Sequence, residues 1–171
     1  RQGADSTLLS DLLRRAAAAL GAGEEEFQAA LASSFMVSAD NAHAMHPHHP
    51  EKYDQTNRVF MNEGVVIKFS ANQKYTTDGV SCALFADVCR RAGVPVQHFA
   101  NRSDMVGGST LGNISGAHVS IPTVDIGLAQ LAMHSSYETA GVRDAQYMAS
   151  ALTACYETEL SVRSDGVYEI G

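Results

Sequence analysis

Hydrophobic positions along the chain follow two spacings. Apolar residues three and four positions apart predict amphipathic helices, and short β-branched or apolar runs between turn-forming residues predict strands. This alternation of strands and helices is typical of an α/β fold, with helices packed on a largely parallel or mixed sheet. Helices are expected over residues 6–20, 23–34, 76–93 and 142–160, with a shorter one within 107–118, and strands over 35–40, 64–70, 95–100, 119–127 and 166–170.

One stretch between the expected strands is polar, irregular and long. It covers residues 41–62, and the motif "SADNAHAMHPHHP" at 38–50 leads into it with Asp40 and four of the seven histidines. Loops of that length inside a compact domain are usually functional. Three interpretations stay open at this point: a metal site, part of a catalytic site, or a polar surface loop.

The composition narrows the class of protein. The length of 171 residues and the 45% hydrophobic content suit one domain, assigned as residues 1–171, with a real core. A net charge of −7 argues against a nucleic-acid partner, and the absence of any apolar run of ~18 residues argues against a membrane span. The three cysteines lie in helix-like apolar patterns, which favours reduced core thiols and a cytoplasmic setting. Because the first residue is Arg1 and not Met, we expect the natural chain to start earlier.

Polar side chains gather at the expected strand ends and in loops. Asp40 follows an apolar strand, and His134 follows another apolar run in "LAMHS". Carboxylate oxygen and imidazole nitrogen displayed in this way suit zinc. Taken singly, however, either residue is better explained as a cap or a structural side chain. The other polar groups in such places are His43, Lys68, Asp104, Asp125 and Glu138.

Three further signals have a plain structural interpretation beside the functional one. His46, His48 and His49 lie in a Pro-flanked loop and are expected to be surface histidines. "GGSTLG" at 107–112 lacks the Lys-Ser/Thr ending of a P-loop and is interpreted as a tight turn. Lys68 ends the run "VVIK", either as a solvated strand end or as a fixed positive charge that faces an acidic substrate group.

Taken together, the motifs resemble those of the aspartyl aminopeptidase family of dinuclear zinc aminopeptidases. The resemblance extends from Gln2 to about Glu159. It rests on "QGADS", "SADNAHAMHP", "GVVIKFSANQKYTTD", "VPVQHFANRSDMVGGSTLGNIS" and "TVDIGLAQLAMHSSYETAG", which occur in the family's order. The resemblance implies a zinc-peptidase α/β fold, a peptide substrate and a homo-oligomer.

The resemblance also implies roles for individual residues. Asp40 matches a ligand of one zinc ion, and His134 matches a ligand of the other and is counted among the substrate-binding positions. His43, Lys68 and Tyr75 match substrate-pocket positions, with Lys68 favouring an N-terminal Asp or Glu in the substrate.

Two departures from the family pattern carry consequences. His48 stands where the family usually has Asn, and the "HHP" ending receives no role. Tyr137 stands where many relatives have Arg, so any charge pairing made by that arginine is in doubt here.

The family's remaining zinc ligands and its general base lie before the segment that matches "QGADS". The chain therefore resembles the C-terminal half of the catalytic domain and is expected to contain no general base of its own. The missing N-terminal half, with an inserted oligomerisation domain, is the expected partner. Two alternatives remain: a non-catalytic half-chain that serves as a structural subunit, and a His-rich metal-binding module built on His43, His46, His48 and His49.

Overall fold

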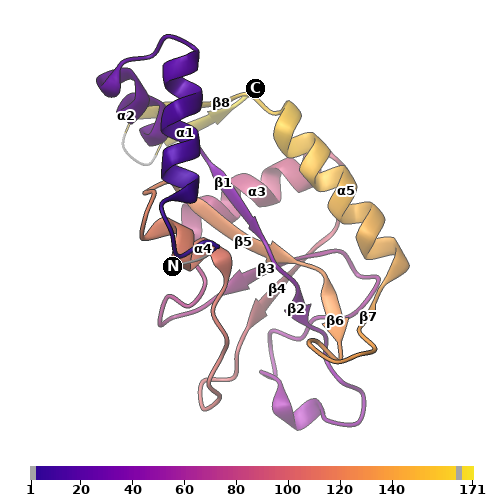
Figure 1. Cartoon of the computed structure of the whole chain (residues 1–171). Coiled ribbons are helices and arrows are strands. Elements are labelled where there is room, and N and C mark those ends of the chain that lie inside the picture. Colours follow the sequence, from indigo (N-terminus) through magenta and orange to yellow (C-terminus); the bar gives the residue numbers. More distant parts are fainter. Residues whose placement is uncertain (1–2, 165–166) are drawn as a thin grey trace.

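The computed structural model describes residues 3–164 and 167–171 and has the predicted α/β architecture (Figure 1). A four-stranded mixed sheet and a three-stranded sheet lie end to end, with a separate two-stranded hairpin near the C-terminus. The helices are α1 (Leu8–Ala19), α2 (Glu24–Ala32), α3 (Gly79–Arg91), α4 (Leu111–Gly116) and α5 (Val142–Glu157), with a 3-10 turn η1 (Pro50–Lys52). The strands are β1 (Met36–Ala39), β2 (Ala42–His43), β3 (Val65–Phe69), β4 (Val96–Ala100), β5 (Thr123–Gly127), β6 (Ala129–Leu131), β7 (Thr139–Ala140), β8 (Leu160–Ser164) and β9 (Val167–Ile170).

The larger sheet has the order β1-β5-β3-β4. β1 pairs parallel with β5, β3 pairs parallel with β4, and β3 and β5 run antiparallel, so the sheet is mixed as predicted. The smaller sheet, β2-β6-β7, continues from it because β1 leads directly into β2 and β5 leads directly into β6. The expected helices and strands are confirmed, but β2, β6, β7 and β8 were not predicted. The opening residues of "QGADS" and of the expected 166–170 strand, Gln2 and Gly166, lie outside the described residues.

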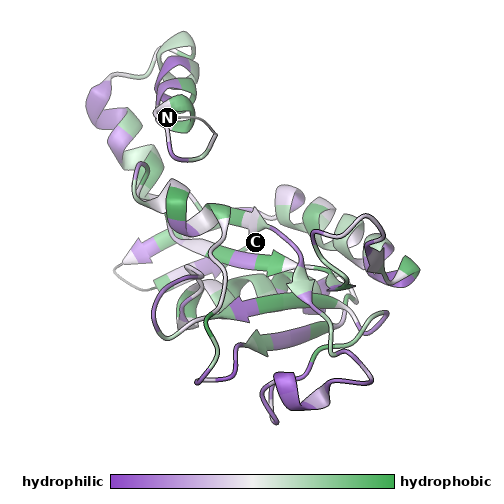
Figure 2. Ribbon diagram, turned by 60° about the horizontal axis from the view of Figure 1, so that its bottom comes forward, coloured by the Kyte–Doolittle hydropathy of each residue, from purple (hydrophilic) through white to green (hydrophobic). Residues whose placement is uncertain are grey.

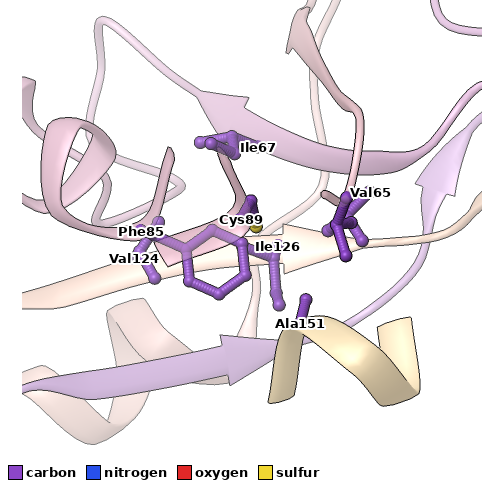
Figure 3. Packing of buried hydrophobic residues seen from close by; sticks show 8 residues of the cluster. Val65, Ile67, Phe85, Cys89, Val124, Ile126 and Ala151 are labelled. Carbon is purple, nitrogen blue, oxygen red and sulfur yellow. The ribbon is translucent and has the colours of Figure 1, made fainter. Parts of the chain in front are cut away.

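Alternation along the central strands separates two buried clusters. Val65 and Ile67 of β3 join the core that α3 and α5 cover, together with Phe85 and Ile126 (Figure 3). The next residue of β3, Val66, packs into a second cluster with Tyr75, Phe99 and residues of β2 and β6. Because successive strand residues point to opposite faces, β3 is buried on both sides, and Lys68 falls on the same face as Val66.

The N-terminal hairpin of α1 and α2 projects from the body of the molecule (Figure 2). No residue of α1 is buried, whereas Phe27 of α2 is. No helix in the described part of the chain is long and apolar enough to cross a membrane.

The cysteines allow a direct check of the core. All three are free thiols, as expected, and Cys89 is fully buried between α3 and the sheet. Burial and the neighbouring Cys155 raise the pKa of Cys89 to about 12. Since the thiolate is the reactive form, we expect a maleimide at pH 8 to leave Cys89 unmodified in the native chain and to label all three cysteines in urea. Mass spectrometry of the labelled peptides measures this. Labelling of native Cys89 as fast as a free thiol would contradict the packing of α3.

Candidate active site

The site lies where the chain passes from the larger sheet to the smaller one. Asp40 is the first residue after β1, and its N–H donates to the Ile126 carbonyl at 2.9 Å. The side chain of the next residue, Asn41, contacts the neighbouring segment where β5 leads into β6. Its Oδ1 accepts from Leu128 N at 3.2 Å, and its Nδ2 donates to Gln130 Oε1 at 2.7 Å. These contacts hold the junction while Asp40 itself is exposed.

A glycine makes this junction possible. A Cβ on Gly127 would lie 2.0 Å from the Asp40 carbonyl oxygen, far inside van der Waals contact. The close approach of β5 to the Asp40 carbonyl therefore requires a residue without a side chain.

Lys68 is buried, with 1% of its surface exposed. Its ammonium group donates to the Asp40 carbonyl at 2.7 Å and lies 5.1 Å from the centre of the Tyr75 ring. Desolvation lowers the pKa of Lys68, while the negative charges of Asp40 and Asp125 act in the opposite direction. The interpretation of Lys68 as a solvated strand end is wrong, because the charge is enclosed and fixed.

Tyr75 forms the other wall around Lys68. The residue is 7% exposed, and burial raises the pKa of its hydroxyl group. The Asn101 side-chain amide donates to the Tyr75 hydroxyl at 3.5 Å, which links β4 to this position. The ring contacts Lys68 through its face, which is the arrangement of a cation–π pair.

His43 and His134 complete the group of candidates. Partial desolvation lowers the pKa of His43, and the nearby His134 and Lys68 side chains lower it further. His134 lies in the loop between β6 and β7 with φ of +67°, a left-handed conformation that histidine adopts more readily than most residues. Its N–H donates to Glu138 Oε1 at 2.6 Å, which holds the turn.

The donor atoms fit part of a zinc site. Among residues 3–164 and 167–171, neither the Asp40 carboxylate nor the His134 ring has a hydrogen-bond partner, so both remain open to a metal. Within the same residues, no three His, Cys, Asp or Glu side chains converge where they could hold a metal ion. The chain thus presents two side chains of the chemistry that zinc accepts, and a complete site needs further donors.

A cavity of about 210 Å³ adjoins His43. Tyr53, Phe99 and Asn101 form part of its lining, together with the backbone around Gly107 and Gly108. The "GGSTLG" segment lies beside the cavity, but the expected tight turn is wrong, because residues 107–110 form no turn and lead directly into α4. The mixed apolar and polar lining of the cavity can accommodate a side chain or a short peptide segment.

The other polar candidates lie elsewhere. His48 and His49 are exposed, which agrees with the prediction of surface histidines, whereas His46 is half-buried. The centre of the His46 ring lies 5.8 Å from that of His48 and 5.2 Å from that of His49. Asp104 forms an exposed ion pair with Arg102. Asp125 was expected at a strand end or in a loop, which is wrong, because it is fully buried within β5.

The comparison with protein families identifies the family of this chain. The family model described as aminopeptidase I zinc metalloprotease (M18) matches residues 1–156, most of the chain. The chain belongs to the M18 aminopeptidase family. A probable M18 family aminopeptidase 2 of Clostridium acetobutylicum is 51% identical over 156 residues, which are 91% of this chain and 36% of that protein.

Solved structures of M18 relatives share the fold. One partner in the cryo-EM structure of the Ape4 and Nbr1 complex is 40% identical and superposes with a TM-score of 0.88, over 91% of this chain and 30% of that one. The S. cerevisiae mApe1 dodecamer is 27% identical with a TM-score of 0.73, over 92% of this chain and 34% of that one. The chain therefore spans about a third of the length of the relatives it matches.

Proposed function

We propose that the chain is the C-terminal part of the catalytic domain of a zinc aminopeptidase that removes N-terminal residues from peptides, with a preference for Asp and Glu. The observation that carries this proposal is the grouping of Asp40, His43, Lys68, Tyr75 and His134 at one sheet junction of a chain from the M18 family. The complete protein, meaning this chain together with the part that corresponds to the rest of its relatives, is the active species.

Asp40 and His134 would each hold one of two zinc ions in the complete protein. When bound, zinc supplies Lewis-acid activation of the scissile carbonyl and lowers the pKa of water toward ~7. The general base and the remaining ligands come from the segment that precedes this chain in the family. The S. cerevisiae mApe1 relative is a dodecamer by its description, which supports a homo-oligomer here too. The three free thiols support a cytoplasmic location.

The residues of this chain bind and orient the peptide. His43 borders the 210 Å³ cavity and, with its pKa lowered, is a neutral imidazole near pH 7, able to donate or accept a hydrogen bond. Lys68 supplies a fixed positive charge close to Asp40, which favours a negatively charged first side chain. Tyr75 shields that charge from water and thereby strengthens its attraction for a carboxylate.

Substitution of Lys68 tests the preference for acidic residues. Lys68→Met keeps the apolar stem and removes the charge, and a charged hydrogen bond of this kind typically contributes about 1.5–3 kcal/mol, or roughly ten- to a hundredfold in rate. In the complete protein, we expect kcat/KM to fall by that factor for aspartyl and glutamyl peptides and much less for leucyl peptides. Steady-state assays on the three substrates measure the effect, with the exposed Lys74→Met as the matched control.

The outcomes separate two roles for Lys68. An equal loss on all three substrates would assign Lys68 to support of the Asp40 carbonyl and not to substrate selection. If the unmutated protein shows no preference for acidic residues, the specificity claim is wrong, and only the aminopeptidase assignment remains.

A further inference from the structure

The fully buried carboxylate of Asp125 lies beside the candidate site, on the strand β5 that pairs with the Lys68 strand β3. Val66 pairs with Gly127 and Ile67 with Ile126, so the next position in the same antiparallel register places Asp125 opposite Lys68. Val124 and Ile126 point into the core beneath α3 and α5. Because side chains alternate along a strand, Asp125 points to the other face, on the same side of the sheet as Lys68.

Three donors satisfy the Asp125 carboxylate. Its Oδ2 accepts from Thr76 N at 2.6 Å and from Thr76 Oγ1 at 2.7 Å, and its Oδ1 accepts from Thr110 Oγ1 at 2.7 Å. In addition, Asp125 N donates to Thr77 Oγ1 at 2.8 Å. A buried carboxylate is costly unless it is hydrogen-bonded, and bonds to a charged acceptor are stronger than neutral ones. The segment that supplies these donors is therefore held firmly to β5.

This segment carries Tyr75, the residue directly before Thr76. Among residues 3–164 and 167–171, the Tyr75 side chain hydrogen-bonds only to Asn101, at the long distance of 3.5 Å. Its position over the Lys68 ammonium group therefore depends on its packing against Phe99 and on where the backbone at Thr76 is fixed. The short hydrogen bonds to Asp125 fix that backbone within one residue of the ring.

Thr110 connects a second loop to the same carboxylate. Thr110 is the residue before α4, and it follows the segment at Gly107 and Gly108 that lines the cavity beside His43. α4 sits tightly against the sheet, since a Cβ on Gly112 would lie 2.9 Å from Asp125 Oδ1. One buried group therefore ties two loops that border the site to β5.

We propose that Asp125 is a positioning residue for substrate binding: through Thr76 and Thr110 it helps to set the Tyr75 ring over Lys68 and holds the cavity-lining segment at Gly107 and Gly108 beside His43. The proposal rests on the aminopeptidase function proposed above, since Tyr75 and Lys68 act there on the substrate. It adds a residue that touches neither peptide nor metal.

Hydroxyl deletion at Thr76 tests the proposal in the complete protein. Thr76→Val removes one donor to Asp125 and keeps the side-chain shape, whereas Thr76→Ser keeps the hydroxyl group. Because Thr76→Val loses one hydrogen bond to a charged acceptor, we expect its KM for aspartyl peptides to rise roughly tenfold and its kcat to change less than about twofold. Thr76→Ser should have near-normal values of both constants. Thr123→Val is the matched control, because it deletes a buried hydroxyl on β5, the strand of Asp125, that donates to the Ile121 carbonyl at 2.7 Å and not to Asp125. The KM of this control should not change.

A purely structural role gives a different result. Partial unfolding lowers the amount of active enzyme, so kcat falls with KM unchanged, and that outcome in Thr76→Val would overturn the proposal. Crystal structures of the unmutated protein and Thr76→Val supply a readout independent of activity. We expect the Tyr75 ring to move away from Lys68 in the variant, and a ring that stays in place overturns the proposal. This structural readout holds even if the unmutated protein cleaves no peptide. Lack of cleavage would separately refute the proposed function. Thr110→Val, with Thr110→Ser as its rescue, repeats the test from the second loop if Thr76→Val does not fold.

Discussion

Asp40→Ala and His134→Ala are each expected to remove one of two metal equivalents from the complete protein and nearly abolish its activity. The two side chains offer a carboxylate and an imidazole with no competing hydrogen bond among the described residues. Changes to residues that only orient metal ligands typically cost about 10–100-fold, so loss of a ligand itself should lower kcat/KM by at least a factor on the order of a hundred. Elemental analysis of the purified variants and steady-state assays measure the two effects.

Matched controls separate metal binding from a general effect of truncation. Asp104→Ala removes an exposed carboxylate, and His48→Ala removes an exposed imidazole from the histidine loop. Both controls should keep two metal equivalents and full activity. An Asp40→Ala protein that is active with two bound metals would show that Asp40 is not a ligand. Loss of metal in His48→Ala would instead support the histidine loop as the metal site.

Gly127→Ala is expected to destabilise the fold and displace Asp40. The new Cβ would lie 2.0 Å from the Asp40 carbonyl oxygen and 2.8 Å from Asn41 Cα, and both are backbone atoms that cannot rotate away. Overpacking of this kind typically costs about 1–3 kcal/mol. Urea unfolding should show that loss, and the metal content should fall because Asp40 moves with its backbone.

Gly79→Ala is the control for this substitution. Gly79 is the first residue of α3, and nothing lies within 4 Å of a Cβ placed there. Alanine is also the better helix former, so stability should be unchanged or slightly higher. A Gly127→Ala protein with the stability and metal content of the unmutated one would contradict the close approach of β5 to Asp40.

The local sequence pattern predicted the longer helices and strands, whose positions depend on the residues within each element. The α3 helix is an example: it was expected over residues 76–93 and is found at Gly79–Arg91, with Gly93 just past its last turn. The helix starts three residues later than expected because Asp78 caps it, accepting from Ser81 N at 2.7 Å. The strands β2, β6 and β7 escaped prediction because they contain only two or three residues each. Strands this short show no period, and they exist because β1 and β5 continue side by side past Asp40 and Gly127.

Prediction of the site was uneven for a related reason. The assignment of Asp40 and His134 as ligands came from residue type and motif, since both follow apolar runs, and it stays a prediction. The burial of Lys68 could not be predicted, because it arises when Tyr75 and the Asp40 carbonyl meet over it from distant parts of the chain. Asp125 was misplaced because a charged residue was taken as a strand end, whereas the apolar residues on either side of it belong to the opposite face. The alternation "TVDIG" contained that information, but the partners Thr76 and Thr110 come only from the tertiary fold.

The most direct measurement of the central claim uses two peptides of identical sequence, one with a free N-terminus and one with it acetylated. The complete protein with zinc, and the 171-residue chain alone, are each incubated with both peptides, and the products are followed by mass spectrometry. We predict stepwise release of N-terminal residues from the free peptide by the complete protein, fastest when Asp or Glu is first. We predict no cleavage of the acetylated peptide and none by the chain alone, which contributes only two of the proposed ligands. Equal cleavage of both peptides, cleavage within the peptide, or no cleavage by the zinc-loaded complete protein would contradict the assignment of this chain to an aminopeptidase active site.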